Sequence, residues 1–148
     1  MSTYGQSLHQ IVFSTKYREK TLLKSERQRI FKYIWGIIKN NKSHLYRMNG
    51  VEDHIHILVS IHPTVALANL VKDIKVGSSH FIKENKILPD FNGWQSGYSY
   101  FTYSKDAKNN LIEYIKNQEV HHQTKSSKEE LIELLHEHGI EFDMQFFE

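Results

Sequence analysis

Alternating residues from Asp53 to Ile61 predict a β-strand with one buried, apolar face. Successive side chains on a strand point to opposite sides, so the core-facing side would carry the aliphatic residues Ile55, Ile57, Val59 and Ile61. His54 and His56 would share the other side. Their ring nitrogens could converge on one divalent metal ion, although the polar face of a half-covered sheet explains the same pattern about as often. Strict alternation turns Asp53 toward the core, so we do not expect it to be a ligand unless the strand is distorted.

The other periodic segments alternate between strands and helices. Strand-like patterns occur in three further segments, residues 7–17, 43–51 and 94–103. The Asn49–Gly50 pair predicts a turn or bulge just before the histidine strand. Apolar residues at helical spacing follow Ser25 and Thr64, which we expect to cap two helices. The order β-α-β-β-α-β predicts an α+β fold of the ferredoxin-like or RRM-like type, in which an antiparallel sheet carries both helices on one face and leaves the histidine face open.

A third helix is expected from Ala107 to about Val120. On this helix Tyr114 and Gln118 lie one turn apart on the same side, and His122 continues that line. Considered alone, such a tyrosine is usually a half-buried core residue whose hydroxyl group reaches water.

A fourth helix is expected from about Lys128. Ser127 and Glu130 have the spacing of a capping box at its start, and Gly139 would end it. The apolar residues of the tail, 140–147, would pack on the same domain or on a partner, because such a segment would be sticky in water.

Length and composition narrow the class of protein. The 148 residues fit one domain over 1–148, with a tyrosine-bearing helix at about 105–120 and a C-terminal helix and tail at about 127–148. The chain has no cysteine, which excludes disulfides and thiolate metal sites. Apolar runs are far shorter than the roughly 20 residues that span a bilayer, so we expect a cytoplasmic protein without membrane association. A net charge of +2 permits a nucleic-acid partner without requiring one.

Several motifs together resemble one family, the single-tyrosine HUH transposases of the smallest bacterial and archaeal insertion sequences, the TnpA type. The resemblance covers nearly the whole chain. It depends on five groups of residues: 11–18, His54-Ile55-His56, Trp94-Gln95 with Gly97-Tyr98, Tyr114 with Gln118, and His138-Gly139-Ile140 with Asp143.

The resemblance implies a metal site and a nucleophile. His54, His56 and Gln118 would hold a divalent ion, Mg²⁺ or Mn²⁺, and Tyr114 would be the catalytic nucleophile. A phenol with a pKa of about 10 attacks poorly at neutral pH, so a cation that draws charge from the scissile phosphate would help. Two imidazoles and an amide oxygen suit manganese, whereas magnesium would bind weakly until the phosphate added ligands. Because His122 shares the helical side of Gln118, the third ligand is less firmly assigned than the histidine pair.

The implied activity is transposition of single-stranded DNA. Tyr114 would form a 5′-phosphotyrosine link and release a 3′-hydroxyl that can later rejoin strands. No nucleotide cofactor is expected, since the bond energy stays in the covalent intermediate and no P-loop pattern occurs. Relatives also imply recognition of hairpins at the element's ends and a homodimer whose tyrosine helices can be exchanged between subunits. Six residues are candidates for DNA contacts: Lys16, Tyr17, Arg18, Lys20, Lys72 and Lys75.

Two alternatives belong to other classes of function. A non-catalytic, domesticated protein could bind single-stranded nucleic acid or hairpins on the open sheet face, where the aromatic residues of segment 94–103 would stack bases. It would bind without metal and form no covalent product. A metal hydrolase could instead use His54, His56 and His122 as ligands and release its products free of protein.

Overall fold

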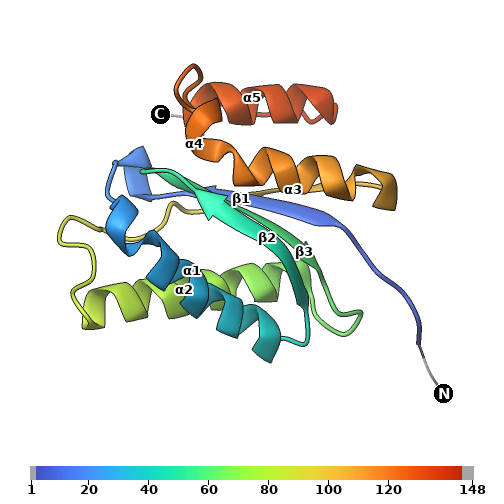
Figure 1. The fold of residues 1–148 in the computed structure, drawn as a ribbon, viewed down its shortest axis with the longest axis horizontal. Helices are drawn as coiled ribbons and strands as arrows, with labels where there is room; N and C mark the ends of the chain where they lie inside the picture. The colour runs from blue at the N-terminus through green and yellow to red at the C-terminus, as the bar shows by residue number, and fades with distance from the viewer. Residues whose placement is uncertain (1–2, 145–148) are drawn as a thin grey trace.

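The computed structural model describes residues 3–144 and shows one antiparallel sheet with helices on both faces (Figure 1). The strands lie in the order β2-β3-β1-β4, and their bounds are His9–Ser14 for β1, His44–Gly50 for β2, His54–Ser60 for β3 and Ser99–Thr102 for β4. The helices are α1 (Lys24–Asn40), α2 (Leu67–Glu84), α3 (Lys108–Lys116), α4 (Gln118–His121) and α5 (Ser127–Glu137), with 3-10 turns η1 (Lys16–Arg18) and η2 (Lys105–Ala107). The predicted order β-α-β-β-α-β is therefore confirmed.

The main core lies between the sheet and the helices α1 and α2. Aliphatic residues of β3 that alternate with the histidines, Ile55, Ile57 and Val59, are fully buried there. Ile11 and Phe13 of β1 join them. The prediction of one apolar strand face is thus confirmed. Burial of these side chains stabilises the fold because it removes apolar surface from water.

The opposite face of the sheet is covered rather than open. Figure 1 shows α3 and α5 lying across the side of the sheet remote from α1 and α2. Val12 and Phe101 on this face pack against three leucines of α5, Leu131, Leu134 and Leu135. Leu58 packs against Ile115 of α3. His54 and His56, which were predicted to lie on this face, are therefore in the protein interior. The expectation of an open face is wrong.

Helix starts and turns differ from the sequence predictions in detail. Ser25 and Thr64 are not caps: the cap positions of α1 and α2 are Leu23 and Ala66, neither with a side-chain cap hydrogen bond. The hydroxyl group of Thr64 instead bonds His62 Nδ1 at 2.7 Å. The aromatic segment forms a strand only over Ser99–Thr102. Packing against the sheet overrides local capping preference at both helices.

The Asn49–Gly50 pair ends β2 and is not the turn. Gly50 pairs directly with Ile55, and the irregularity of the β2–β3 ladder lies between Leu45 and Arg47. The chain reverses through residues 51–53. A Cβ atom at Gly50 would lie 2.5 Å from the carbonyl oxygen of His54. The glycine is therefore needed for close approach of two backbones at the base of the histidine strand.

We expect Gly50→Ala to lower the free energy of unfolding by about 2 kcal/mol or more, because its Cβ atom would collide with backbone that cannot rotate away. Urea denaturation followed by circular dichroism would measure the change. Gly36→Ala is the matched control: nothing lies within 4 Å of its Cβ position inside α1. It should stabilise the protein by about 0.5–1 kcal/mol. Equal behaviour of the two variants would contradict the close approach at Gly50.

The predicted helix 107–120 is divided into α3 and α4. The break falls at Asn117, which has ψ of 22° and ends the regular helical hydrogen bonding. Asn49 of β2 donates its side-chain amide to the carbonyl oxygen of Lys116 at 3.0 Å. A side chain from a distant strand thus satisfies a carbonyl group at the end of α3. No local sequence signal could have indicated this contact.

The start of α5 is shifted by one residue from its predicted capping box. Ser126, not Ser127, is the cap: its hydroxyl oxygen accepts from the backbone N–H of Glu129 at 3.2 Å and donates to the Glu129 carboxylate at 3.1 Å. Glu129 therefore takes the capping-box position, and Glu130 is buried. Gly139 follows the helix with φ of +64°, the left-handed conformation expected of a residue that ends a helix.

The C-terminal tail is described only to residue 144. Phe142 packs against the leucine cluster of α5, as expected for a tail that packs on its own domain. The prediction for residues 145–147 lies outside the described residues. Over residues 3–144, none of the helices has the length and apolar character needed to cross a membrane.

Candidate active site

His54 and His56 occupy adjacent same-side positions of β3, beneath the helices α3 to α5. Their side chains are 1% and 0% exposed. The ring centroids of the two imidazoles are 5.1 Å apart. Alternation along the strand therefore directs both imidazole rings to the same side of the sheet, as the sequence predicted.

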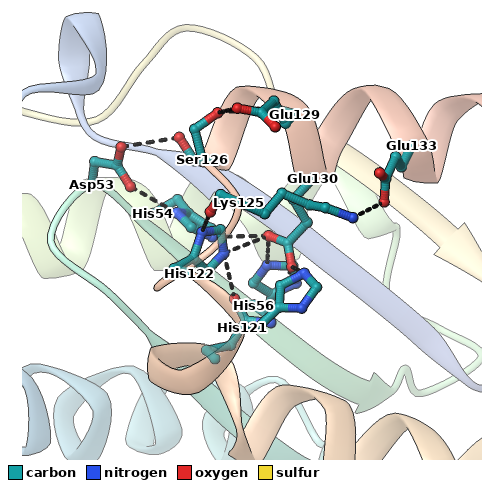
Figure 2. Close-up of polar contacts among 12 residues, drawn as sticks. Asp53, His54, His56, His121, His122, Lys125, Ser126, Glu129, Glu130 and Glu133 are labelled. Atoms are coloured by element: carbon teal, nitrogen blue, oxygen red, sulfur yellow. Dashed lines mark hydrogen bonds and ion pairs between the residues drawn. The ribbon is translucent and has the colours of Figure 1, made fainter.

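Glu130, in the first turn of α5, is the centre of the site (Figure 2). Its Oε1 lies 3.1 Å from His54 Nε2, 2.9 Å from His56 Nε2 and 3.0 Å from the Nε2 of His122, which caps the end of α4. One ligand atom from each of these four residues lies within 4.8 Å of all the others. Three imidazole nitrogens and a carboxylate thus converge in a buried space.

The outer nitrogen of each imidazole is held by an oxygen acceptor. His54 Nδ1 is 2.8 Å from Asp53 Oδ1, His56 Nδ1 is 2.7 Å from Gln10 Oε1, and His122 Nδ1 is 2.6 Å from the Lys125 carbonyl. Carboxylate and carbonyl oxygens only accept, so each Nδ1 carries its proton. In the neutral rings, each Nε2 then presents a lone pair to Glu130. Four electron-rich atoms this close require positive charge among them, and metal-binding histidines are held in this way.

The pKa shifts of the buried histidines and of Glu130 also indicate that positive charge is favoured in the site. Burial would lower the pKa of His54, but hydrogen bonds to Asp53 and Glu130 outweigh it and raise this pKa to about 9. Burial lowers the pKa of His56. Burial would raise the pKa of Glu130, but hydrogen bonds with His122, His54 and His56 hold it well below its usual range. A proton on His54 or a divalent cation can balance the carboxylate.

Tyr114 and Gln118 reach the same carboxylate from α3 and α4. The Tyr114 hydroxyl group donates to Glu130 Oε2, and Gln118 Nε2 donates to that atom at 3.2 Å. Gln118 Oε1 lies 3.1 Å from His122 Nε2, and Gln118 is fully buried. Burial, and then the charge of Glu130, raise the pKa of Tyr114. The phenol is thus kept protonated until something offsets the negative charge beside it.

The structure brings together all four residues singled out as ligands or nucleophile, and it adds two acids. Asp53 is not turned to the core: β3 begins at His54, so alternation does not extend to Asp53, whose carboxylate accepts from Ser127 Oγ at 3.0 Å and bonds His54. Glu130 was missed because Ser127 and Ser126 offer two capping registers one residue apart. Only the register that starts at Ser126 frees Glu130 for the site.

The candidate DNA-contacting residues are not among the groups that contact Glu130, although Arg18 is near enough to Asp53 to feel its charge. Lys16, Tyr17, Lys20 and Lys72 are exposed, and Arg18 is half-buried. Lys75 is held by the protein: its ammonium group donates to the carbonyl oxygens of Gln95, at 3.0 Å, and Gly97. Burial lowers the pKa of Lys75 to about 8. Lys75 is therefore less available for phosphate than its exposed neighbours.

Comparisons with known proteins identify the family and support the fold. A four-stranded ferredoxin-like sheet with His-x-His beside a tyrosine-bearing helix defines the class of single-tyrosine HUH transposases. The model of one family, described as "Transposase IS200 like", matches residues 3–118. The chain belongs to the IS200-like transposase family. His122 and Glu130 lie beyond the matched residues.

Individual relatives share the fold at low sequence identity. The TnpA transposase of ISDra2 from Deinococcus radiodurans is 24% identical over 115 residues, 74% of this chain and 82% of that protein. A crystal structure at 1.90 Å of a chain from Deinococcus radiodurans R1 assigned as a transposase superposes with a TM-score of 0.61 at 21% identity, covering 80% of this chain and 95% of that one. A REP-associated tyrosine transposase bound to a REP hairpin gives a TM-score of 0.60 at 15% identity, covering 82% and 74%.

We expect Gln10→Leu to weaken manganese binding by about 10- to 100-fold, because it removes the acceptor that fixes the His56 ring and its tautomer. Isothermal titration calorimetry with Mn²⁺ would measure the affinity. Gln10→Glu is the control, since it keeps an oxygen near His56 Nδ1 and should lose much less affinity. If both variants bind manganese as tightly as the wild type, the role of Gln10 in orienting His56 is wrong.

Proposed function

We propose that this chain cleaves and rejoins single-stranded DNA at the ends of an insertion sequence, with Tyr114 as the nucleophile and a divalent ion held next to it. One observation supports this most: the Tyr114 hydroxyl group and the Nε2 atoms of three histidines contact the same Glu130 carboxylate. A phenol and a metal-ligand set within reach of one two-oxygen anion are suitably placed for one phosphodiester.

The proposed ligands are His54, His56 and Gln118. His122 and Glu130 are further donors at the same point, so the chain offers more ligands than the resemblance implied. We propose Mn²⁺ or Mg²⁺ as the ion, and the nitrogen-rich set favours Mn²⁺. When bound, the ion would draw charge from the scissile phosphate and help to offset the charge of Glu130.

The protein's own residues then account for the movement of protons and bonds. Glu130 Oε2 accepts the Tyr114 hydrogen bond and is the group placed to take its proton as the phenol oxygen attacks. A bond forms between the Tyr114 oxygen and phosphorus, and the bond from phosphorus to the 3′ oxygen of the preceding nucleotide breaks. That oxygen takes up the proton that Glu130 accepted and leaves as a 3′-hydroxyl, which restores the Glu130 carboxylate. Reversal of these steps with another 3′-hydroxyl rejoins strands.

The substrate that we propose is single-stranded DNA with hairpin ends, which one structural relative supports by its REP hairpin. We propose that the site is assembled within one chain, because Tyr114 reaches Glu130 and the histidines of its own chain. A homodimer stays a prediction from the resemblance. The alternative of a stacking surface on an open sheet has less support, because α3 and α5 cover that face.

A covalent-adduct assay tests the proposal. The protein is incubated with Mn²⁺ and single strands from the two ends of its own element, and the products are separated on a denaturing gel. We expect a slow-migrating protein–DNA species that EDTA prevents. Cleaved DNA free of protein would instead indicate a metal hydrolase, and binding without cleavage would indicate a non-catalytic module.

A further inference from the structure

The turn η1, which follows β1, has a strained backbone. Tyr17 has φ of 58° and ψ of 18°, and Arg18 has φ of 55°. Both residues therefore lie in the left-handed region, which residues with a Cβ atom rarely adopt. Within residues 3–144 the other two non-glycine residues of positive φ, Lys42 and Lys86, each follow the end of a long helix, where this conformation is usual. Tyr17 and Arg18 follow a strand instead, so the end of a long helix does not explain their conformation.

Hydrogen bonds to neighbouring segments hold the turn in this conformation. Thr15 Oγ1 donates to the carbonyl oxygen of Glu19 at 2.6 Å and closes the turn. The backbone N–H of Thr15 donates to the carbonyl oxygen of Asp53 at 2.8 Å. The backbone N–H of Lys16 donates to the carbonyl oxygen of Gly93 at 2.9 Å. Backbone strain persists only where surrounding contacts determine it, and it occurs most often at active sites and ligand-binding segments.

The turn lies beside the histidine strand. Ser14, the last residue of β1, pairs with His54 in the antiparallel ladder. Tyr17 is three residues further along the chain, so its Cα atom lies within about 11 Å of that of Ser14. Arg18 interacts electrostatically with Asp53, the residue before His54. A DNA strand that reaches the proposed ion from this side passes over the turn.

The turn exposes an aromatic ring among cations. Tyr17 is 76% exposed, so its ring contributes little to the packing of the fold. Lys16 Nζ lies 5.6 Å from the centroid of this ring. Lys16 and Lys20 are also exposed. This combination suits single-stranded nucleic acid, because bases stack on aromatic rings while cations neutralise the phosphates.

We propose that η1 is a stacking platform for single-stranded DNA, in which the Tyr17 ring packs on one unpaired base while Lys16 and Lys20 contact the flanking phosphates. The fixed backbone directs the ring before DNA binds, so less conformational freedom is lost on binding. Every base has a flat face, so the platform accepts any unpaired base. A base inside a duplex is excluded, because its faces are covered by its neighbours. The inference rests on the proposed function, in which the same strand continues to Tyr114.

Binding of a fluorescein-labelled oligothymidylate, measured by fluorescence anisotropy with EDTA present, tests the platform without cleavage. Tyr17→Ala removes the ring and should weaken binding by about 5- to 100-fold, whereas Tyr17→Phe keeps the ring and should bind within about twofold of wild type. Tyr4→Ala is the matched control and should bind as the wild type does: Tyr4 is 91% exposed and precedes β1, at the end of that strand remote from the turn. Wild-type binding by Tyr17→Ala, or equal loss in Tyr4→Ala, would overturn the inference.

A second variant separates stacking from a structural role of the ring. Tyr17→Gly removes the ring and relieves the left-handed strain. It should therefore lose binding as Tyr17→Ala does, while its midpoint of thermal unfolding stays at or above that of the wild type. A lower midpoint would show that the ring stabilises the fold, and would overturn the inference.

The salt dependence of binding separates the ring from the cations. Lys16→Gln should reduce the slope of log affinity against log salt concentration by about 0.7, the value for one phosphate contact on a single strand. Tyr17→Ala should leave this slope unchanged, because stacking releases no counterions. A reduced slope in Tyr17→Ala would show that a phosphate contact was lost instead, and would contradict the stacking role.

The covalent-adduct assay separates failure of this inference from failure of the proposed function. If Tyr17→Ala binds oligothymidylate as the wild type does and both form the Tyr114 adduct, the platform is overturned and the transposase function stands. If Tyr17→Ala loses binding as expected but the wild type forms no adduct, the platform is supported and the proposed role of Tyr114 is overturned.

Discussion

Tyr114→Phe is expected to abolish the covalent protein–DNA adduct while leaving hairpin binding within about twofold of wild type. The change removes only the hydroxyl oxygen that would bond to phosphorus. The ring still packs in the cluster with Leu8, Leu58 and Ile115. Loss of the hydrogen bond to Glu130 should alter the free energy of unfolding by no more than about 1–2 kcal/mol. Adducts on denaturing gels and fluorescence anisotropy of labelled hairpins measure the two effects.

Tyr46→Phe is the matched control for this experiment. Tyr46 also packs, half-buried, against the cluster that contains Tyr114, but it has no contact with Glu130 among the described hydrogen bonds. It should form adducts at the wild-type rate. Normal adduct formation by Tyr114→Phe, or loss in both variants, would show that Tyr114 is not the nucleophile.

His56→Ala is expected to weaken manganese binding by at least about 100-fold and to abolish adduct formation. The imidazole is fully buried, and its Nε2 lies 2.9 Å from Glu130, so the change removes a nitrogen donor from the centre of the proposed ligand set. Thermal unfolding gives a readout independent of catalysis. Manganese at about 100 times the wild-type dissociation constant should stabilise the wild type by about 2.7 kcal/mol, and the variant by no more than about 0.4 kcal/mol.

His80→Ala controls for the loss of an imidazole elsewhere. His80 is exposed on α2 and pairs only at the surface with Glu84, at 3.0 Å. Such a pair contributes little to stability. The control should keep both the stabilisation by manganese and the adduct. Stabilisation of His56→Ala by manganese to the wild-type extent would place the ion somewhere other than between the histidines.

Local periodicity was enough to predict most of the fold and four residues of the candidate site, His54, His56, Tyr114 and Gln118. Alternation over β3 correctly separated Ile55 and Ile57 from His54 and His56, because the pleat of a strand fixes side-chain direction without reference to the rest of the chain. Helical spacing likewise placed Tyr114 and Gln118 on one side. The order of these elements was enough to predict the sheet.

The remaining features depend on contacts between distant segments. The break at Asn117 is satisfied by Asn49 of β2, and the covering of the histidine face depends on leucines of α5 packing on β1 and β4. A one-residue shift of a capping box decides whether Glu130 faces water or the histidines. Local patterns cannot distinguish two registers of nearly equal capping energy, because tertiary packing chooses between them.

The central claim is that one ion lies between His54 and His56, next to the Tyr114 hydroxyl group. Crystals of the protein soaked in Mn²⁺ would test it directly, because anomalous scattering at the manganese edge locates the ion without reference to a model. We expect a single strong peak in contact with Nε2 of both histidines, with a further donor from Gln118, His122 or Glu130. A peak remote from the histidine pair, or none at saturating manganese, would contradict the claim.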